Sequence, residues 1–156
     1  MNNTEEDYIT IKTRWNIPFE HHAGKTASRY FTAMRDHQTI MGTKCPRCHR
    51  VLVPARSFCE QCFVPAEEWV ELGNQGTIQT FAINCMKYEG LPDPPYVIAL
   101  IKLDGADTSM MHWIGGLDLS DIGQAANRIK IGARVEAVWK KDREGAVTDI
   151  VYFRLV

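Results

Sequence analysis

The spacing of apolar and polar residues predicts β-structure over most of the second half of this chain. In the segment 134–140, Val135, Ala137 and Trp139 alternate with a set that includes Arg134, Glu136 and Lys140, which is the pattern of a strand with one buried face. The other β-rich runs, bounded by turn signals, lie at 69–72, 77–88, 96–103, 110–114 and 147–155. Five or six strands, with a helical or irregular insertion at 120–131, favour a closed barrel of the OB type, although an SH3-like barrel or a small sandwich has the same periodicity.

Residues 26–38 have the spacing of an amphipathic helix. Ala27, Tyr30, Phe31 and Met34 follow one another at i, i+3, i+4 and i+7. Thr26 is a suitable N-cap. The chain is therefore mainly β, with one helix near its N-terminus.

Residues 1–24 show little periodicity, but Trp15, Ile17 and Phe19 are large apolar residues around Pro18. We expect an extended arm that docks on another surface, and a disordered tail is the alternative for residues 1–10. A thin arm and a small ribbon cannot bury so much apolar surface, and exposed apolar patches mark protein interfaces. The predicted partner interface comprises Trp15, Ile17, Phe19, Tyr30, Phe31 and Met34.

Two CxxC pairs indicate a metal site between the helix and the strands. Cys45 and Cys48 form the first pair, and Cys59 and Cys62 form the second. Each pair presents two thiolates from one tight turn, and two facing turns complete a tetrahedral zinc shell. The segments 40–44 and 51–53 are expected to pair as the strands of a ribbon. Because four thiolates leave no open coordination position, we expect one structural Zn²⁺ per chain; disulfides or free thiols are the alternative, and a rubredoxin-type iron uses the same ligands.

Composition is that of an ordinary soluble domain. The 156 residues are 45% hydrophobic and 24% charged, and no run of 18 apolar residues is present. The acidic, polar N-terminus is the reverse of a signal peptide, which predicts a cytoplasmic protein in which disulfides are rare. The fifth cysteine, Cys85, falls in a strand-like segment and is expected in the core.

Basic residues gather around the cysteines. The chain has a formal net charge of −1, but residues 21–56 carry seven Lys and Arg residues against one acid, Asp36. This island favours an anionic partner, and a solvated surface is the plain alternative. The members in and beside the ribbon are Lys44, Arg47, Arg50 and Arg56.

These patterns divide the chain into three parts. An N-terminal arm and helix occupy 1–42, a zinc ribbon 43–66, and a β-barrel 67–156.

In this order, the parts resemble a family of thiolase-associated, acyl-CoA-related accessory proteins that was long labelled a domain of unknown function. The resemblance covers residues from about 28 to the C-terminus. The residues that carry it are Cys45-Pro-Arg-Cys48, Val53-Pro-Ala-Arg56, Cys59-Glu-Gln-Cys62, Trp69-Val-Glu-Leu72, Gly76-Thr-Ile78, the run 95–103 and Ile131-Gly-Ala-Arg-Val135.

The resemblance implies a rubredoxin-like zinc ribbon followed by an OB-fold barrel. It also implies a subunit without catalytic residues of its own, bound in a hetero-oligomer to a thiolase-fold enzyme (a thiolase, acyltransferase or aldolase) that acts on acyl-CoA thioesters. The subunit would assist acyl-CoA binding and the assembly of the complex. Lys44, Arg47, Arg50 and Arg56 are then candidates to bind the phosphates of coenzyme A at or near the interface.

The residues also bear on two other function classes, an enzyme and a nucleic-acid-binding module. No ordered nucleophile–base motif connects Ser109, Cys85 and His112, and His112 is expected to be a bonded core or rim histidine. A single-stranded nucleic-acid-binding module is the alternative function, with Phe81, Tyr88 and Tyr96 as stacking faces. The acidic excess of the barrel half disfavours nucleic acid. No role is assigned to the proline-rich loop 91–95, and for His21 and His22 the alternatives are contact with a partner and a plain surface position.

Overall fold

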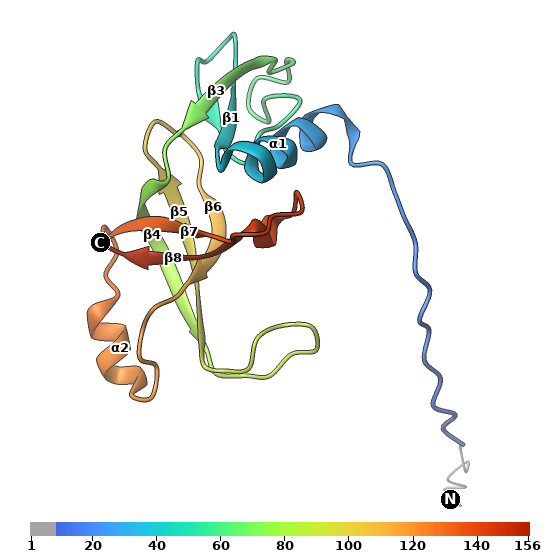
Figure 1. Cartoon of the computed structure of the whole chain (residues 1–156), viewed down its shortest axis with the longest axis vertical. Coiled ribbons are helices and arrows are strands. Elements are labelled where there is room, and N and C mark those ends of the chain that lie inside the picture. The colour runs from blue at the N-terminus through green and yellow to red at the C-terminus, as the bar shows by residue number, and fades with distance from the viewer. Residues whose placement is uncertain (1–8) are drawn as a thin grey trace, which may run out of the picture.

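The computed structural model describes residues 9–156 (Figure 1). The first eight residues of the expected arm lie outside the described residues. An extended arm over 9–23 leads into α1 (Gly24–His37), which thus begins before the predicted N-cap Thr26. Ala23 occupies the N-cap position and makes no side-chain capping bond. The helix ends at Gln38, whose left-handed backbone (φ 54°) lets its N–H donate to the carbonyl of Met34.

Three short strands form the sheet of the ribbon. They are β1 (Ile40–Lys44), β2 (Val51–Leu52) and β3 (Glu68–Leu72), in the antiparallel order β2-β1-β3. The expected pairing of the strands before and after the first CxxC is confirmed, with Thr43 opposite Leu52. β3 enters this sheet from the far side of the second CxxC, and so closes the ribbon.

The rest of the chain forms a closed five-stranded barrel (Figure 1). Its strands pair in the order β4-β5-β6-β8-β7, and β4 and β7 close the ring. The parallel contact between β6 and β8, at Ile114 and Phe153, gives the third and fifth strands the arrangement of an OB fold. This order excludes the sandwich. The elements are β4 (Gln75–Asn84), β5 (Tyr96–Leu103), β6 (Met110–Ile114), α2 (Ile122–Arg128), β7 (Arg134–Trp139), the 3-10 turn η1 (Val147–Asp149) and β8 (Ile150–Leu155).

Inward-facing apolar residues of these strands fill the barrel. Ile78, Ile101, Val135 and Phe153 are fully buried. Gly76 lies where β4 pairs with both β5 and β7, and a Cβ at that position would lie 2.6 Å from the carbonyl oxygen of Lys102. Closure of the barrel therefore needs a residue without a side chain there.

Helix α1 packs on the ribbon sheet and also contacts the hairpin between β7 and β8. Tyr30 and Met34 are buried in the main core, beside Ile40 of β1. The Arg143 guanidinium donates from Nε to the carbonyl of Arg35 at 2.8 Å. Helix α1 thus contacts both the ribbon and the barrel.

Two sequence expectations are corrected here. β4 ends at Asn84, so Cys85 is an exposed residue at the start of a loop instead of a core residue. The segment expected as a strand from Val147 begins as a 3-10 turn, because Asp149 accepts bonds from the chain before it. Within residues 9–156, no helix has the length and apolar character needed to cross a membrane.

Candidate metal centre

The first cysteine pair is held by a tight backbone turn. The N–H of Cys45 donates to the carbonyl of Arg50, and the N–H of His49 donates to the carbonyl of Cys45, each at 2.9 Å. The N–H groups of Arg47 and Cys48 point at the Cys45 sulfur, at 3.4 and 3.5 Å. Such donors stabilise a thiolate, which is the form that binds a metal.

The second pair repeats this turn at the same offsets. Cys59 donates to the carbonyl of Val64, and Phe63 donates back to Cys59, again at 2.9 Å. In both turns the residue after the second cysteine, His49 or Phe63, has a left-handed backbone with φ of 61° and 53°. Glycine is the usual residue for that conformation. Because glycine is absent at both positions, the repeated geometry could not be predicted from the residues.

The four sulfurs fit a tetrahedral zinc ion. The four Sγ atoms lie within 4.8 Å of one another, and those of Cys48 and Cys59 are 3.8 Å apart. Ligands about 2.3 Å from a tetrahedral zinc are separated by roughly 3.8 Å, whereas a disulfide requires about 2.05 Å. Cys45 and Cys59 are fully buried, and Cys48 and Cys62 are half-buried. The ribbon thus holds a structural zinc site rather than two disulfides.

The pKa values of the clustered thiols also favour a bound cation. The N–H of Cys48, with that of Arg47, lowers the pKa of the Cys45 thiol to about 6. Burial and the neighbouring sulfurs raise the pKa of Cys62 to about 12 when no cation is present. Four thiolates this close cannot all be charged alone, and a divalent ion removes that conflict.

Three of the four candidate CoA-binding cations are engaged in exposed ion pairs within the ribbon. Lys44 lies 3.4 Å from Glu68, and Arg50 and Arg56 both pair with Glu60, at 3.3 and 3.2 Å. Arg47 is exposed and forms no ion pair with residues 9–156. Glu60 thus brings Arg50 and Arg56 together, whereas Lys44 pairs with a different acid.

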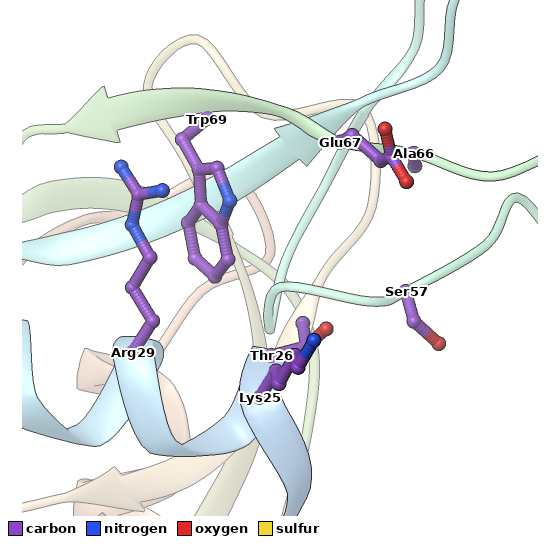
Figure 2. A pocket seen from close by; sticks show the side chains of 7 residues that line it. All are labelled: Lys25, Thr26, Arg29, Ser57, Ala66, Glu67 and Trp69. Carbon is purple, nitrogen blue, oxygen red and sulfur yellow. The ribbon is translucent and has the colours of Figure 1, made fainter.

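A hollow of about 270 Å³ lies between the start of α1 and the ribbon (Figure 2). The Arg29 guanidinium lies over the Trp69 ring, 4.4 Å from its centre, and this contact joins helix to sheet. Glu67 contributes a carboxylate. Sequence reasoning missed this hollow because its residues come from three separated segments. It is lined by Lys25, Thr26, Arg29, Ser57, Ala66, Glu67 and Trp69.

The six residues of the predicted partner interface differ in their exposure to solvent. Trp15, Ile17 and Phe19 are exposed. In contrast, Tyr30 and Met34 are buried in the protein's own core, and Phe31 packs against that core. Tyr30 and Met34 are therefore not available to a partner as predicted, because the barrel and ribbon together, rather than the ribbon alone, cover them; for Phe31 the interface stays a prediction.

His112, considered for catalysis, and Tyr96, considered for base stacking, are both buried inside the barrel domain. His112 is buried, its Nδ1 accepts the N–H of Trp113 at 2.9 Å, and its Nε2 lies 3.3 Å from the carbonyl of Val147. Burial lowers the pKa of His112, so it is a neutral, bonded core histidine, as expected. Tyr96 is also buried, edge-on to Trp113, and so offers no stacking face.

Two family models match adjoining segments of the chain. The model described as the ChsH2 rubredoxin-like zinc ribbon domain matches residues 32–68. The model described as the ChsH2 C-terminal OB-fold domain matches residues 69–140. The two domains occur here in the order in which the fold places them.

Curated relatives and solved structures agree with these matches. A DUF35 domain-containing scaffold protein of Methanocaldococcus jannaschii is 24% identical over 83% of this chain and 87% of its own. The protein of that description from Methanothermobacter thermautotrophicus is 27% identical, over 73% and 81%. A DUF35-family structure from Sulfolobus solfataricus superposes with a TM-score of 0.59 at 25% identity, covering 85% of this chain and 84% of that one. The Ltp2-ChsH2(DUF35) aldolase structure gives 0.59 at 19% identity, over 87% and 98%, which shows a shared fold.

Proposed function

Because the chain belongs to the DUF35 family, with the zinc ribbon and OB-fold domains of ChsH2, we propose that it is a zinc-binding accessory subunit of a thiolase-fold enzyme complex. That complex acts on acyl-CoA thioesters, in a thiolase, acyltransferase or aldolase reaction. The subunit assists the assembly of the complex and the binding of acyl-CoA, and it contributes no catalytic residue.

The observation that carries this proposal is the match of both domains over residues 32–140. Relatives with this architecture are described as scaffold proteins, and a structure of the same fold is that of an aldolase named for Ltp2 together with ChsH2. A scaffold acts through a partner, so the family itself favours a complex. The enzyme class of the partner is our extension.

The exposed apolar side chains of the N-terminal arm support the proposal that the subunit binds a partner protein. Trp15, Ile17 and Phe19 are exposed to water, on a segment that meets the barrel through an exposed ion pair between Arg14 and Glu89. Large aromatic residues with this exposure are typical anchors of protein interfaces. Bound to a partner, they would leave water without any change in the core of the subunit.

The ribbon cations support a role in acyl-CoA binding. Coenzyme A carries its phosphates at one end, and the arginine fork binds phosphate with two hydrogen bonds. Arg47 is free to do so, and its turn is held by the metal centre, which lowers the ordering cost of binding. The exposed ion pairs of Lys44, Arg50 and Arg56 are weak enough for a phosphate to compete with their carboxylates.

The experiment that tests the proposal is native co-purification followed by reconstitution. The tag is placed at Val156, away from the arm, and the proteins that stay bound after size exclusion are identified by mass spectrometry. We expect a thiolase-fold protein whose turnover of an acyl-CoA thioester rises when the subunit is added back. Acyl-CoA turnover by the isolated chain, or bound single-stranded nucleic acid in place of a protein, would contradict the proposal.

A further inference from the structure

We propose that the N-terminal arm binds as an added β-strand at an open sheet edge of the partner protein. Residues 1–24 taken together showed little periodicity, but the segment from Ile9 to Phe19 alternates strictly. Every odd position except Thr13 is a large apolar residue, and every even position is polar or proline. A period of two places one row of side chains on each face of an extended strand. This inference takes the partner from the proposed function and adds how it is bound.

Exposure agrees with this pattern. The odd-position residues Ile9, Ile11, Trp15, Ile17 and Phe19 are 92, 81, 83, 64 and 80% exposed. The two domains leave these side chains in water, and the arm meets the barrel through the exposed ion pair between Arg14 and Glu89, at 3.3 Å. An apolar row this long has no role in water, whereas an apolar surface beside a sheet edge would bury it.

Pro18 decides which edge of the arm can pair. The N–H and C=O groups of alternate residues point to the same edge of a strand, so odd and even residues serve opposite edges. Pro18 lacks an N–H and breaks the donor row of the even edge. Proline is tolerated in a strand where its nitrogen faces away from the ladder. The odd-numbered amides therefore pair with the partner, the even edge faces water, and the arm is an outermost strand.

The occupant is another protein and not a second copy of this chain. The barrel is closed, but β4 pairs with β7 only over residues 75–77, so residues 79–84 of β4 have no strand partner on that side among the described residues. The outer strands of the ribbon sheet, β2 and β3, are two and five residues long. The alternating segment has 11 residues and spans roughly 35 Å when extended. Each of these edges is too short to pair with the whole segment.

The test measures amide hydrogen exchange in the arm at single-residue resolution. The probe is the complex isolated from native cells through a C-terminal tag, and the free subunit is measured alongside. We expect the amides of Ile11, Thr13, Trp15, Ile17 and Phe19 to be protected in the complex. The amides of Lys12, Arg14 and Asn16 should exchange nearly as fast as in the free subunit.

Proline substitutions test the same geometry by affinity. Thr13→Pro removes a donor from the pairing edge and should weaken the complex about tenfold. Thr13→Ala keeps the donor and should stay within about twofold, as should Asn16→Pro on the open edge. Trp15→Ala should weaken the complex about tenfold or more through its lost side chain. None of these substitutions touches the core, so thermal unfolding of the free subunit should not change.

Each contrary outcome has a definite meaning. Equal loss with Thr13→Pro and Asn16→Pro, or an unprotected arm within the complex, would overturn strand addition while leaving the proposed function intact. Alternating protection by a partner of another enzyme class would uphold strand addition and overturn the proposed function. Protection that appears in the subunit alone and rises with its concentration would mean self-association and overturn the inference. A subunit isolated without any bound protein would overturn it as well.

Discussion

The hydroxyl of Thr108 bonds both main-chain polar groups of Val53 across the boundary between barrel and ribbon. Its Oγ1 accepts the Val53 N–H at 2.7 Å and donates to the Val53 carbonyl at 2.9 Å. The neighbouring pair repeats the link, because Asp107 accepts the N–H of Val51 at 2.8 Å and donates its own N–H to the Val51 carbonyl at 2.9 Å. Residues over 50 positions apart thus exchange hydrogen bonds in the manner of a short ladder.

The hydrogen bonds between Thr108 and Val53 predict that Thr108→Val destabilises the protein. The substitution keeps the shape of the side chain but leaves the polar groups of fully buried Val53 without partners. Each unmet buried group costs about 1–3 kcal/mol, so the loss of two partners should lower the free energy of unfolding by about 2–6 kcal/mol. Urea denaturation measures it. Thr108→Ser keeps the hydroxyl and is the matched control. Equal stability of the Val and Ser variants would show that the hydrogen bonds of Thr108 do not contribute to the free energy of unfolding.

Removal of any one zinc ligand is expected to unfold the ribbon. Structural zinc supplies on the order of 10 kcal/mol in small domains, more than a short ribbon gains from its own core. Cys59→Ser should lose the bound metal, measured by elemental analysis, and the ribbon should become open to protease. Cys85→Ser is the control, because Cys85 is exposed and outside the cluster. A soluble wild-type protein with no metal, or a Cys59→Ser protein that keeps a full equivalent, would contradict the prediction.

Asp149 is expected to make stability depend on pH. Its buried carboxylate accepts the N–H groups of Glu144, Gly145 and Ala146 at 3.0, 2.8 and 3.2 Å. Burial alone would raise the pKa of Asp149, but these donors outweigh burial and hold the pKa below its usual value. A lowered folded-state pKa stabilises the fold above the unfolded value near 3.9, and this stabilisation is lost as the pH falls through the folded value.

Asp149→Asn should therefore cost about 1–3 kcal/mol at pH 7, because an amide presents one acceptor where the carboxylate presents two. The difference between wild type and variant should shrink as the pH falls below about 4. Urea denaturation at pH 7 and pH 3 measures both differences. Asp142→Asn, at an exposed position in the same hairpin, is the control. A difference between wild type and Asp149→Asn that is the same at both pH values would contradict the assignment.

Arg47→Glu is expected to weaken acyl-CoA binding in the assembled complex. Arg47 is exposed and unpaired within the described residues, so charge reversal should raise the KM for an acyl-CoA about threefold to tenfold without unfolding the ribbon. Arg128→Glu, on α2 and also exposed, is the control. A dephospho-CoA thioester identifies the contact: if Arg47 binds the 3′-phosphate, the variant should no longer discriminate between the two substrates. Wild-type discrimination in the variant would exclude that contact.

Much of the architecture was predictable from local spacing. The CxxC pairs fixed the position of the metal centre, because two cysteines three residues apart can share one turn whatever surrounds them. Period-two segments gave the barrel strands, and period 3.6 gave α1, since these periods reflect one buried face. The resemblance to the zinc-ribbon and OB-fold family followed from these same blocks, and the family models bear it out.

Features that depend on contacts between distant segments were not predictable. Cys85 sits in an apolar run but lies beyond the end of β4, where nothing covers it. The ion pair of Arg50 with Glu60 forms because the metal turns bring the two ends of the ribbon loop together. The φ values of His49 and Phe63 carry no sequence signal, because glycine is absent at both positions.

The sequence by itself determined which segments are strands, helix and metal turns, because those choices depend on neighbours within a few positions along the chain. Only the tertiary structure decided that β6 runs beside β8, that Thr108 bonds Val53, and that Tyr30 and Met34 face the protein's own core. An apolar helix face fits a barrel or a partner equally well by pattern. The barrel and the ribbon together cover the helix face, whereas they leave the apolar side chains of the arm exposed to water.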